Sequence, residues 1–196
     1  TGAALSASGA GMQAVFGHPM AEPHVLGVSS GAALGAAIAT VLGLETSGLG
    51  ISALSLCAFG GAILAAAAVL ALSRIDGRTG TASLLLAGIA MGAFLSALLS
   101  GLLALNREKA DSVYLWAMGS FATATWGKIR LAAPVTALGC LTATLYARDL
   151  NVMLAGETDA RTLGLDVRRT RALALLLSTL MTAVVVSMTG VIGFVG

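Results

Sequence analysis

The sequence has little charge, few aromatic side chains and only two cysteines. Charged residues make up 10% of the 196 residues and aromatic residues 5%, whereas hydrophobic residues make up 57%. A soluble domain carries about 25% charged residues. The shortage of charge excludes an ordinary soluble domain, and a net charge of +2 gives no reason to expect a nucleic-acid partner.

Other absences exclude bound groups. Cys57 and Cys140 lie far apart within apolar segments, and no Cys-x-x-Cys or Cys/His spacing is present. We expect two buried thiols and no metal or cofactor on this chain. The phosphate-binding motif G-x-x-x-x-G-K-[ST] is also missing. The start has neither a basic signal-peptide region nor a Met, which predicts a piece of a longer protein.

Long runs without charge dominate what is there. A bilayer core needs about 20 apolar residues in a helix. Such a length predicts an all-α, polytopic membrane protein with about six transmembrane segments in one domain, residues 1–196. The predicted spans are a short one at 2–17 and five longer ones at 26–44, 49–73, 82–105, 131–147 and 172–196.

The cationic residues predict which way the bundle faces. Cytoplasmic connectors carry an excess of Lys and Arg. One set of connectors holds seven arginines and the other holds four cations, so we expect the first set inside and the second outside. The two sets are Arg74, Arg78, Arg148, Arg161, Arg168, Arg169 and Arg171, and Arg107, Lys109, Lys128 and Arg130.

The two longest connectors have different predicted roles. The outer one contains a short helix from Asp111 to Phe121, which Gly119 can end. The inner one, Arg148 to Arg171, contains a short helix capped by Thr158 or Asp159 and ending near Gly164. It is longer than a usual bundle connection of about 2–8 residues and amphipathic, which favours a docking surface over a solvated loop that only fixes topology.

The segment from Phe16 to Gly35 holds both histidines, two of the three prolines and a G-x-S-x-G motif. A serine nucleophile would need a histidine base within reach, and we expect none because His18 and His24 share the serine's own connector. A metal pair would lack a third ligand beyond Glu22. We therefore expect solvated histidines, followed by a helix whose glycines at every fourth position allow close packing.

If this chain transports a molecule, the energy for transport must come from a partner subunit. All nine acidic residues lie in connectors or at the ends of spans, whereas ion-coupled carriers usually place ionisable residues inside the membrane. A transporter without such charges and without a nucleotide site takes its energy from another subunit.

Several motifs in order resemble the FecCD/BtuC-type permeases of ABC importers, which carry ferric siderophores, haem and cobalamin. The first resembles the family's F-x-N-P-L-A-[DE]-P-x-x-L-G, with His18 and Met20 as departures. Its matching residues include Pro19, Ala21, Glu22, Pro23 and Gly27. The others are S-L-L-L-A-G-I-A-M-G from Ser83, W-A-M-G-S-F from Trp116, L-A-G-E-T-D-A-R-T-L-G-L ending at Leu165, and the terminal T-G-V-I-G-F-V-G.

The resemblance implies a BtuC-like (type II importer) helical bundle of ten helices that works as a homodimer, of which this chain lacks the first helix and the last three. It implies coupling helices within 155–167 that receive the ATP-binding subunit, a cytoplasmic gate at Thr81 and Ala82, and a translocation path along the helix from Ser83 and the short outer helix. The implied coupling residues are Glu157, Asp159, Ala160, Arg161, Leu163 and Gly164, and the path residues are Gly88, Gly92, Ser96, Trp116, Met118, Gly119 and Ser120.

The resemblance therefore implies the membrane subunit of an importer in the bacterial cytoplasmic membrane. Its partners would be an ATP-binding cassette subunit, which holds ATP and Mg²⁺, and an extracytoplasmic substrate-binding protein. A secondary carrier or channel without an ATPase is the alternative from another class. An intramembrane hydrolase, which would use Ser29 or Ser30, is a third.

Overall fold

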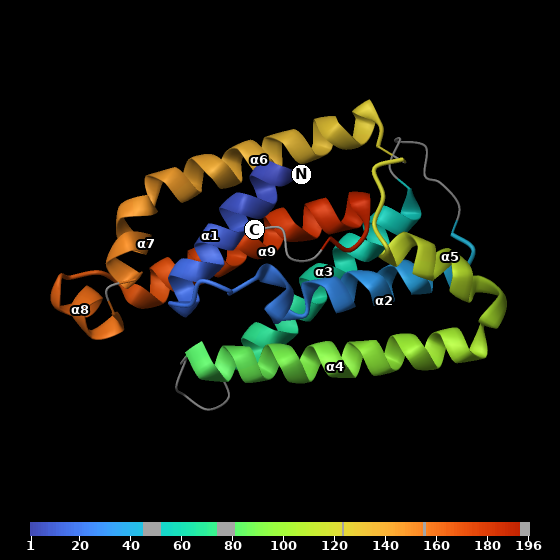
Figure 1. The fold of residues 1–196 in the computed structure, drawn as a ribbon, viewed down its shortest axis with the longest axis horizontal. Helices are drawn as coiled ribbons and strands as arrows, with labels where there is room; N and C mark the ends of the chain where they lie inside the picture. The colour runs from blue at the N-terminus through green and yellow to red at the C-terminus, as the bar shows by residue number, and fades with distance from the viewer. Residues whose placement is uncertain (45–51, 74–80, 123, 155, 193–196) are drawn as a thin grey trace.

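The computed structural model describes residues 1–44, 52–73, 81–122, 124–154 and 156–192. Within these ranges every regular element is a helix (Figure 1), which confirms the all-α prediction. The elements are α1 (Gly2–Phe16), η1 (Pro23–Leu26), α2 (Val28–Val41), α3 (Ala53–Leu72), α4 (Thr81–Leu105), α5 (Arg107–Ala117), α6 (Trp126–Leu145), α7 (Ala147–Leu154), α8 (Glu157–Thr162) and α9 (Val167–Thr189).

Three of the described helices, α3, α4 and α9, are long and apolar enough to cross a membrane. A fourth span is possible if α6 and α7, which meet at a bend of 59°, act together. By helix length alone, the described residues thus contain three or four of the about six predicted transmembrane segments. Helices α1 and α2 account for the difference, because they have 15 and 14 residues and are too short to be counted as spans.

Helix α2 corrects the prediction of one continuous span at 26–44. It has 14 residues, which corresponds to about 21 Å of helix against a bilayer core of about 30 Å. It begins late because Gly27 takes a left-handed conformation, with φ 69°, between η1 and α2. The chain thus reaches α2 through a short 3₁₀ turn that lies inside the bundle.

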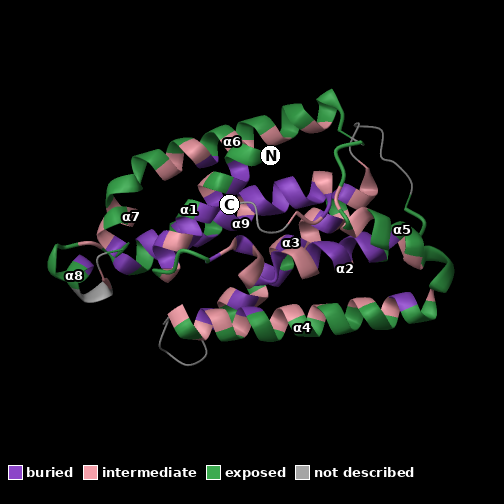
Figure 2. Cartoon of the chain, viewed as in Figure 1, coloured by how far each residue is buried: buried purple, intermediate pink, exposed green. Residues whose placement is uncertain are grey.

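The core forms where α1, η1, α2, α3 and α9 meet, and Figure 2 shows its buried residues at the centre of the molecule. Met12, Leu26 and Val186 are fully buried there. Helices α4 and α6 lie on opposite sides of this core (Figure 1). In the most apolar window of α4 only 11% of residues are buried, against 61% in α9.

Glycines bring α2 and α3 into backbone contact. A Cβ added to Gly31 would overlap the carbonyl oxygen of Gly61, and one added to Gly35 would overlap that of Cys57. Small residues at spacing four allow this approach in membrane helices. The predicted glycine-faced packing of this helix is confirmed.

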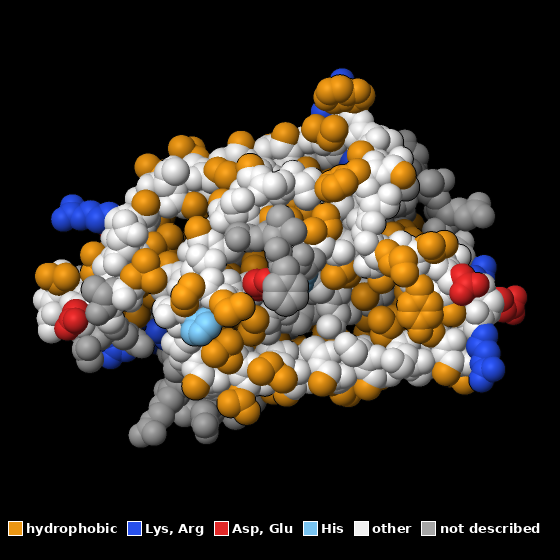
Figure 3. All heavy atoms as spheres, in the orientation of Figure 1, with side chains coloured by type: hydrophobic (Ala, Val, Ile, Leu, Met, Phe, Trp, Pro, Cys, Tyr) orange, Lys and Arg blue, Asp and Glu red, His pale blue; other side chains and the backbone are white. Residues whose placement is uncertain are grey.

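The bundle has two ends that carry most of the charge. The α8 end consists of α7, α8 and the start of α9, and the α5 end consists of α5 and the start of α6 (Figure 1). Lys and Arg side chains lie mainly toward these ends, and hydrophobic side chains cover the face between them (Figure 3). The two predicted sets of cations therefore separate, except that Arg74 and Arg78 lie outside the described residues and Arg171 is buried within α9.

The short helices differ from their predicted limits. Helix α5 begins at Arg107 rather than Asp111, with Asn106 as its N-cap. Helix α8 begins after Gly156, so neither Thr158 nor Asp159 is its cap. Helix α7 was not predicted, because Arg148 and Asp149 interrupt the apolar run that ends with α6.

Candidate functional site

The surface of the α8 end is built around one buried alanine. Ala160 is fully buried and packs with Met153 of α7 and Val167 of α9. Asp159 and Arg161 point away from this contact and are exposed, and Leu163 is 73% exposed. Helix α8 thus packs on the bundle with its inner side and exposes its outer side. The side chain of Glu157 lies outside the described part of the chain.

The turn after α8 fixes its direction toward α9. Gly164 has φ 81°, and its N–H donates to the carbonyl of Arg161 at 3.0 Å. The N–H of Leu165 donates to the carbonyl of Ala160 at 3.1 Å. This pair of hydrogen bonds is the Schellman motif, which favours glycine at the left-handed position. Asp166 then caps α9 by accepting from the N–H of Arg169 at 3.1 Å.

The predicted path residues of α4 lie on the side that faces η1 and α2. A Cβ on Gly88 would overlap the carbonyl oxygen of Val25, so α4 contacts the η1 backbone there. Gly92 lies beside Gly27, and Ser96 donates to Ser30 at 3.4 Å. Ser96 is nevertheless exposed. Elsewhere on α4, Leu86, Ile89 and Phe94 are each more than half exposed.

The predicted gate residues stand at the start of α4. Thr81 is half-buried and Ala82 is exposed. One turn later, Leu84 is buried beside Arg171 and Leu175 of α9. The start of α4 and the α9 segment that follows α8 therefore line the same small cavity.

The short outer helix is attached to the far end of α9. The N–H of Ser120 donates to the carbonyl of Thr189 at 2.7 Å. Gly119 has φ 70° and packs against Val191 and Gly190, while Trp116 lies against the main core. Met118 is 79% exposed. The structure thus brings α5 and α9 together, although their contacting residues are about 70 positions apart.

The Pro-rich segment between α1 and α2 is half outside the bundle and half inside it. Gly17, His18 and Pro19 are exposed, whereas Ala21 and Pro23 are buried and Glu22 is half-buried. Only the first half of this segment is therefore exposed to solvent. Ala21 joins the main core, which holds the inner half in place.

The expectation of two solvated histidines holds for His18 and is wrong for His24. His24 is half-buried, and its Nε2 lies 2.6 Å from the carbonyl oxygen of Ile192. Its Nδ1 contacts the hydroxyl of Ser29, so a histidine does reach the G-x-S-x-G serine. Sequence reasoning missed this because the partner carbonyl lies 168 residues away.

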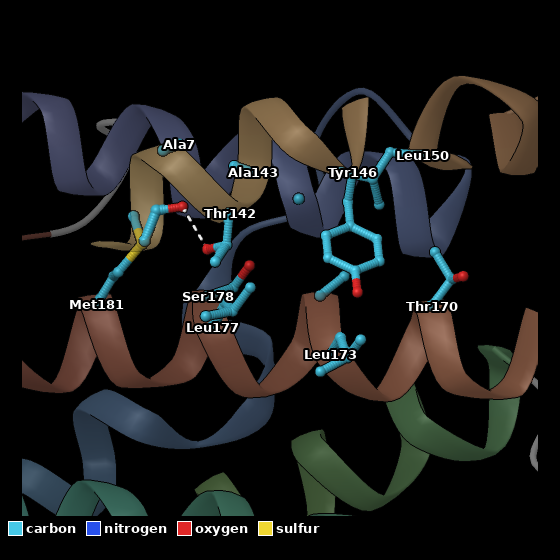
Figure 4. A pocket seen from close by; sticks show the side chains of 13 residues that line it. Ala7, Thr142, Ala143, Tyr146, Leu150, Thr170, Leu173, Leu177, Ser178 and Met181 are labelled. Carbon is cyan, nitrogen blue, oxygen red and sulfur yellow. Dashed lines mark hydrogen bonds between the residues drawn. The ribbon is translucent and has the colours of Figure 1, made fainter. Parts of the chain in front are cut away.

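Several cavities lie between the described helices, among them one of 70 Å³ between α3, α4 and α9. A smaller one, 20 Å³, is enclosed by α1, α6 and α9, with Tyr146 and Met181 on its walls (Figure 4). That volume fits about one water molecule. Two open grooves are larger: one of 760 Å³ between α1 and the α6–α7 pair, and one of 530 Å³ between α2, α3 and α4. Cys140 and Cys57 line these two grooves, so both thiols are half-buried rather than buried as expected.

Among the described residues, no three His, Cys, Asp or Glu side chains converge in a way that could hold a metal ion. The polar groups inside the described part of the bundle are mainly hydroxyls and backbone carbonyls, together with His24 and the buried Arg171. Ser8 and Thr182 share one such contact at 3.3 Å between α1 and α9. These features define a helical membrane protein that carries short, exposed helices at both of its charged ends.

Comparison with known proteins identifies the group to which this bundle belongs. The FecCD transport family matches residues 1–196, and the chain belongs to that family. It is 42% identical over 195 residues to the cobalamin import system permease protein BtuC of Halobacterium salinarum, covering 100% of this chain and 52% of that protein. It is 36% identical over 197 residues to the hemin transport system permease protein HmuU of Yersinia pestis, covering 100% of this chain and 59% of that protein.

A solved structure shares the fold. A chain of a metal-chelate type ABC transporter in an inward-facing conformation superposes with a TM-score of 0.87 and 30% sequence identity. The match covers 100% of this chain and 62% of that one. The chain thus spans little more than half the length of the curated relatives named above, and the predicted BtuC-like permease bundle is confirmed for the part it contains.

Proposed function

We propose that this chain is part of the membrane permease of an ABC importer that moves a ferric siderophore, haem or cobalamin across the cytoplasmic membrane. ATP hydrolysis in a separate subunit would supply the energy. Membership in the FecCD transport family and the named relatives support this function. The observation that carries the coupling is the α8 surface, which is anchored by Ala160 and exposed on its other side.

The α8 surface has the properties of a contact site for the ATP-binding subunit. Leu163 supplies exposed apolar area, and Asp159 and Arg161 flank it with both signs of charge. An apolar centre with a polar rim is the usual anatomy of a protein interface. We include Glu157 and Gly164 in this site, because the first opens α8 and the second sets the turn into α9.

The path would run along α4. This helix is the least buried of the three long apolar helices, so lipid or a second copy of the permease must cover its outer side. We propose a homodimer with the path between the copies, lined by α4 and the short segment from Trp116 to Ser120. Gly88 and Gly92 would set the position of α4, Ser96 and Met118 would border the path, and Thr81 and Ala82 would form its gate at the α8 end.

A bulky chelate suits a path of this kind. Apart from Arg171 near the start of α9, the described interior offers hydroxyls and carbonyls rather than fixed charges, and deep charges would hold back a large cargo whose own charge is shielded. An extracytoplasmic binding protein would deliver the cargo at the α5 end.

The test is uptake by the full-length permease in liposomes with its ATP-binding subunit and its binding protein. We expect ATP-dependent uptake of one labelled cargo, with competition by the unlabelled form of that cargo and not by the other two among a ferric siderophore, haem and cobalamin. Uptake that persists without the ATP-binding subunit would overturn the proposal in favour of a secondary carrier or channel.

A further inference from the structure

His24 joins two segments that are distant in the sequence. Its Nε2 lies 2.6 Å from the carbonyl oxygen of Ile192, three residues after the end of α9. Its Nδ1 contacts the hydroxyl of Ser29 in the first turn of α2. One imidazole ring therefore connects η1, α2 and the segment after α9.

The carbonyl partner determines which ring nitrogen must carry a hydrogen. A carbonyl oxygen only accepts, so Nε2 must carry the hydrogen. In the neutral imidazole the other nitrogen is then an acceptor, and Ser29 can donate to it. Both ring nitrogens are satisfied, which is the usual condition of a polar group placed inside a bundle.

Each side of this link continues into a functional element. On one side, η1 contacts α4 through the carbonyl of Val25 at Gly88. On the other side, Ile192 packs on the small buried cluster that contains Met181 and Val185 of α9. Helix α9 in turn begins beside α8, where Val167 packs on Ala160. A continuous chain of contacts thus runs from the α8 surface through α9 and His24 to α4.

We propose that His24 is a positioning residue for transport: its imidazole holds η1 to the end of α9, so that a displacement of α8 and α9 reaches α4. This role rests on the proposed importer function. His24 touches neither cargo nor nucleotide, and its effect is on how fast the permease changes state rather than on what it binds.

The first test measures uptake by the full-length permease with its ATP-binding subunit and binding protein. His24→Ala removes both hydrogen bonds, and we expect turnover to fall about tenfold while the KM for the loaded binding protein changes less than about twofold. His24→Gln keeps an N–H that can reach Ile192, so it should restore most of the turnover. His18→Ala is the matched control, because His18 is the other histidine of this chain and is exposed.

Equal losses in His18→Ala and His24→Ala would overturn the proposal, as would a His24→Gln variant as slow as His24→Ala. If His24→Ala fails to fold, judged by size-exclusion chromatography, the His24→Gln variant and Ser29→Ala carry the test. Ser29→Ala removes one of the two partners and should lower turnover less than His24→Ala does.

The second test does not depend on transport. Nitrogen-15 NMR of histidine-labelled full-length permease in lipid, compared with His24→Gln to assign the signal, reports the ring form directly. We expect the His24 signal to show a hydrogen on Nε2, and an Nε2 without a hydrogen would overturn the proposal. A permease that shows this ring but imports none of the three chelates would refute the proposed function and leave the His24 link established.

Discussion

The contact between Gly88 and η1 makes a sharp prediction about the stability of the bundle. A Cβ at Gly88 would overlap the carbonyl oxygen of Val25 and lie 3.0 Å from its carbonyl carbon. Both obstacles are backbone atoms, which cannot rotate away as a flexible side chain would. Gly88→Ala therefore forces α4 and η1 apart.

The size of the expected loss in stability follows from a comparison with Gly101, a second glycine of the same helix. A Cβ at Gly101 meets nothing within 4 Å, so Gly101→Ala should gain only helix propensity, about 1 kcal/mol. Gly88→Ala gains the same propensity and bears an overpacking cost of about 1–3 kcal/mol. Because the propensity terms cancel, we expect Gly88→Ala to be less stable than Gly101→Ala by about 1–3 kcal/mol.

The assay is the free energy of unfolding of the full-length permease, measured by titration with a denaturing detergent in mixed micelles. Both variants are compared with the unmodified protein under the same conditions. A Gly88→Ala variant as stable as Gly101→Ala would show that the α4–η1 contact is looser than described, and the reasoning from backbone overlap would fail.

Three further predictions concern the α8 end and the serine of the G-x-S-x-G motif. Arg161→Glu should lower ATP-driven uptake about tenfold with the permease still folded; unchanged uptake and unchanged ATPase stimulation would refute a coupling role for Arg161. Gly164→Ala should destabilise the turn after α8 by about 1–2 kcal/mol because φ is 81° there, seen as faster proteolysis at α8 than in the unmodified protein. Ser29 should not react with a fluorophosphonate probe, because it lies in the first turn of α2 rather than on a strained strand-to-helix elbow; labelling that Ser29→Ala abolishes would revive the hydrolase interpretation.

The parts of the fold that follow from local spacing were predictable. Gly31 and Gly35 lie four residues apart in an apolar run, which already indicates a close helix contact, and the length of the uncharged runs indicates α3, α4 and α9. The short helix before Gly164 was also found, because the glycine marks its end. These signals need only neighbouring residues.

The parts that depend on distant contacts were not predictable. No pattern near His24 points to Ile192. The two prolines beside it indicate an exposed turn, and only the contact with the segment after α9 shows that His24 is half-buried. Helix α7 was missed for a different reason: Arg148 and Asp149 lower the hydropathy, although the helix continues past the bend. The path residues of α4 stay a prediction, since their contacts with η1 decide only where the helix lies.

The backbone contact between α2 and α3 has a consequence for motion. Carbonyl groups of one helix face the glycine Cα atoms of the other, so neither helix can slide or rotate without passing atoms through one another. The two helices must therefore move as a single rigid body. A conformational change in this half of the molecule must therefore occur in the backbone that connects the pair to its neighbours. The connection nearest to α2 is the left-handed Gly27, between η1 and α2.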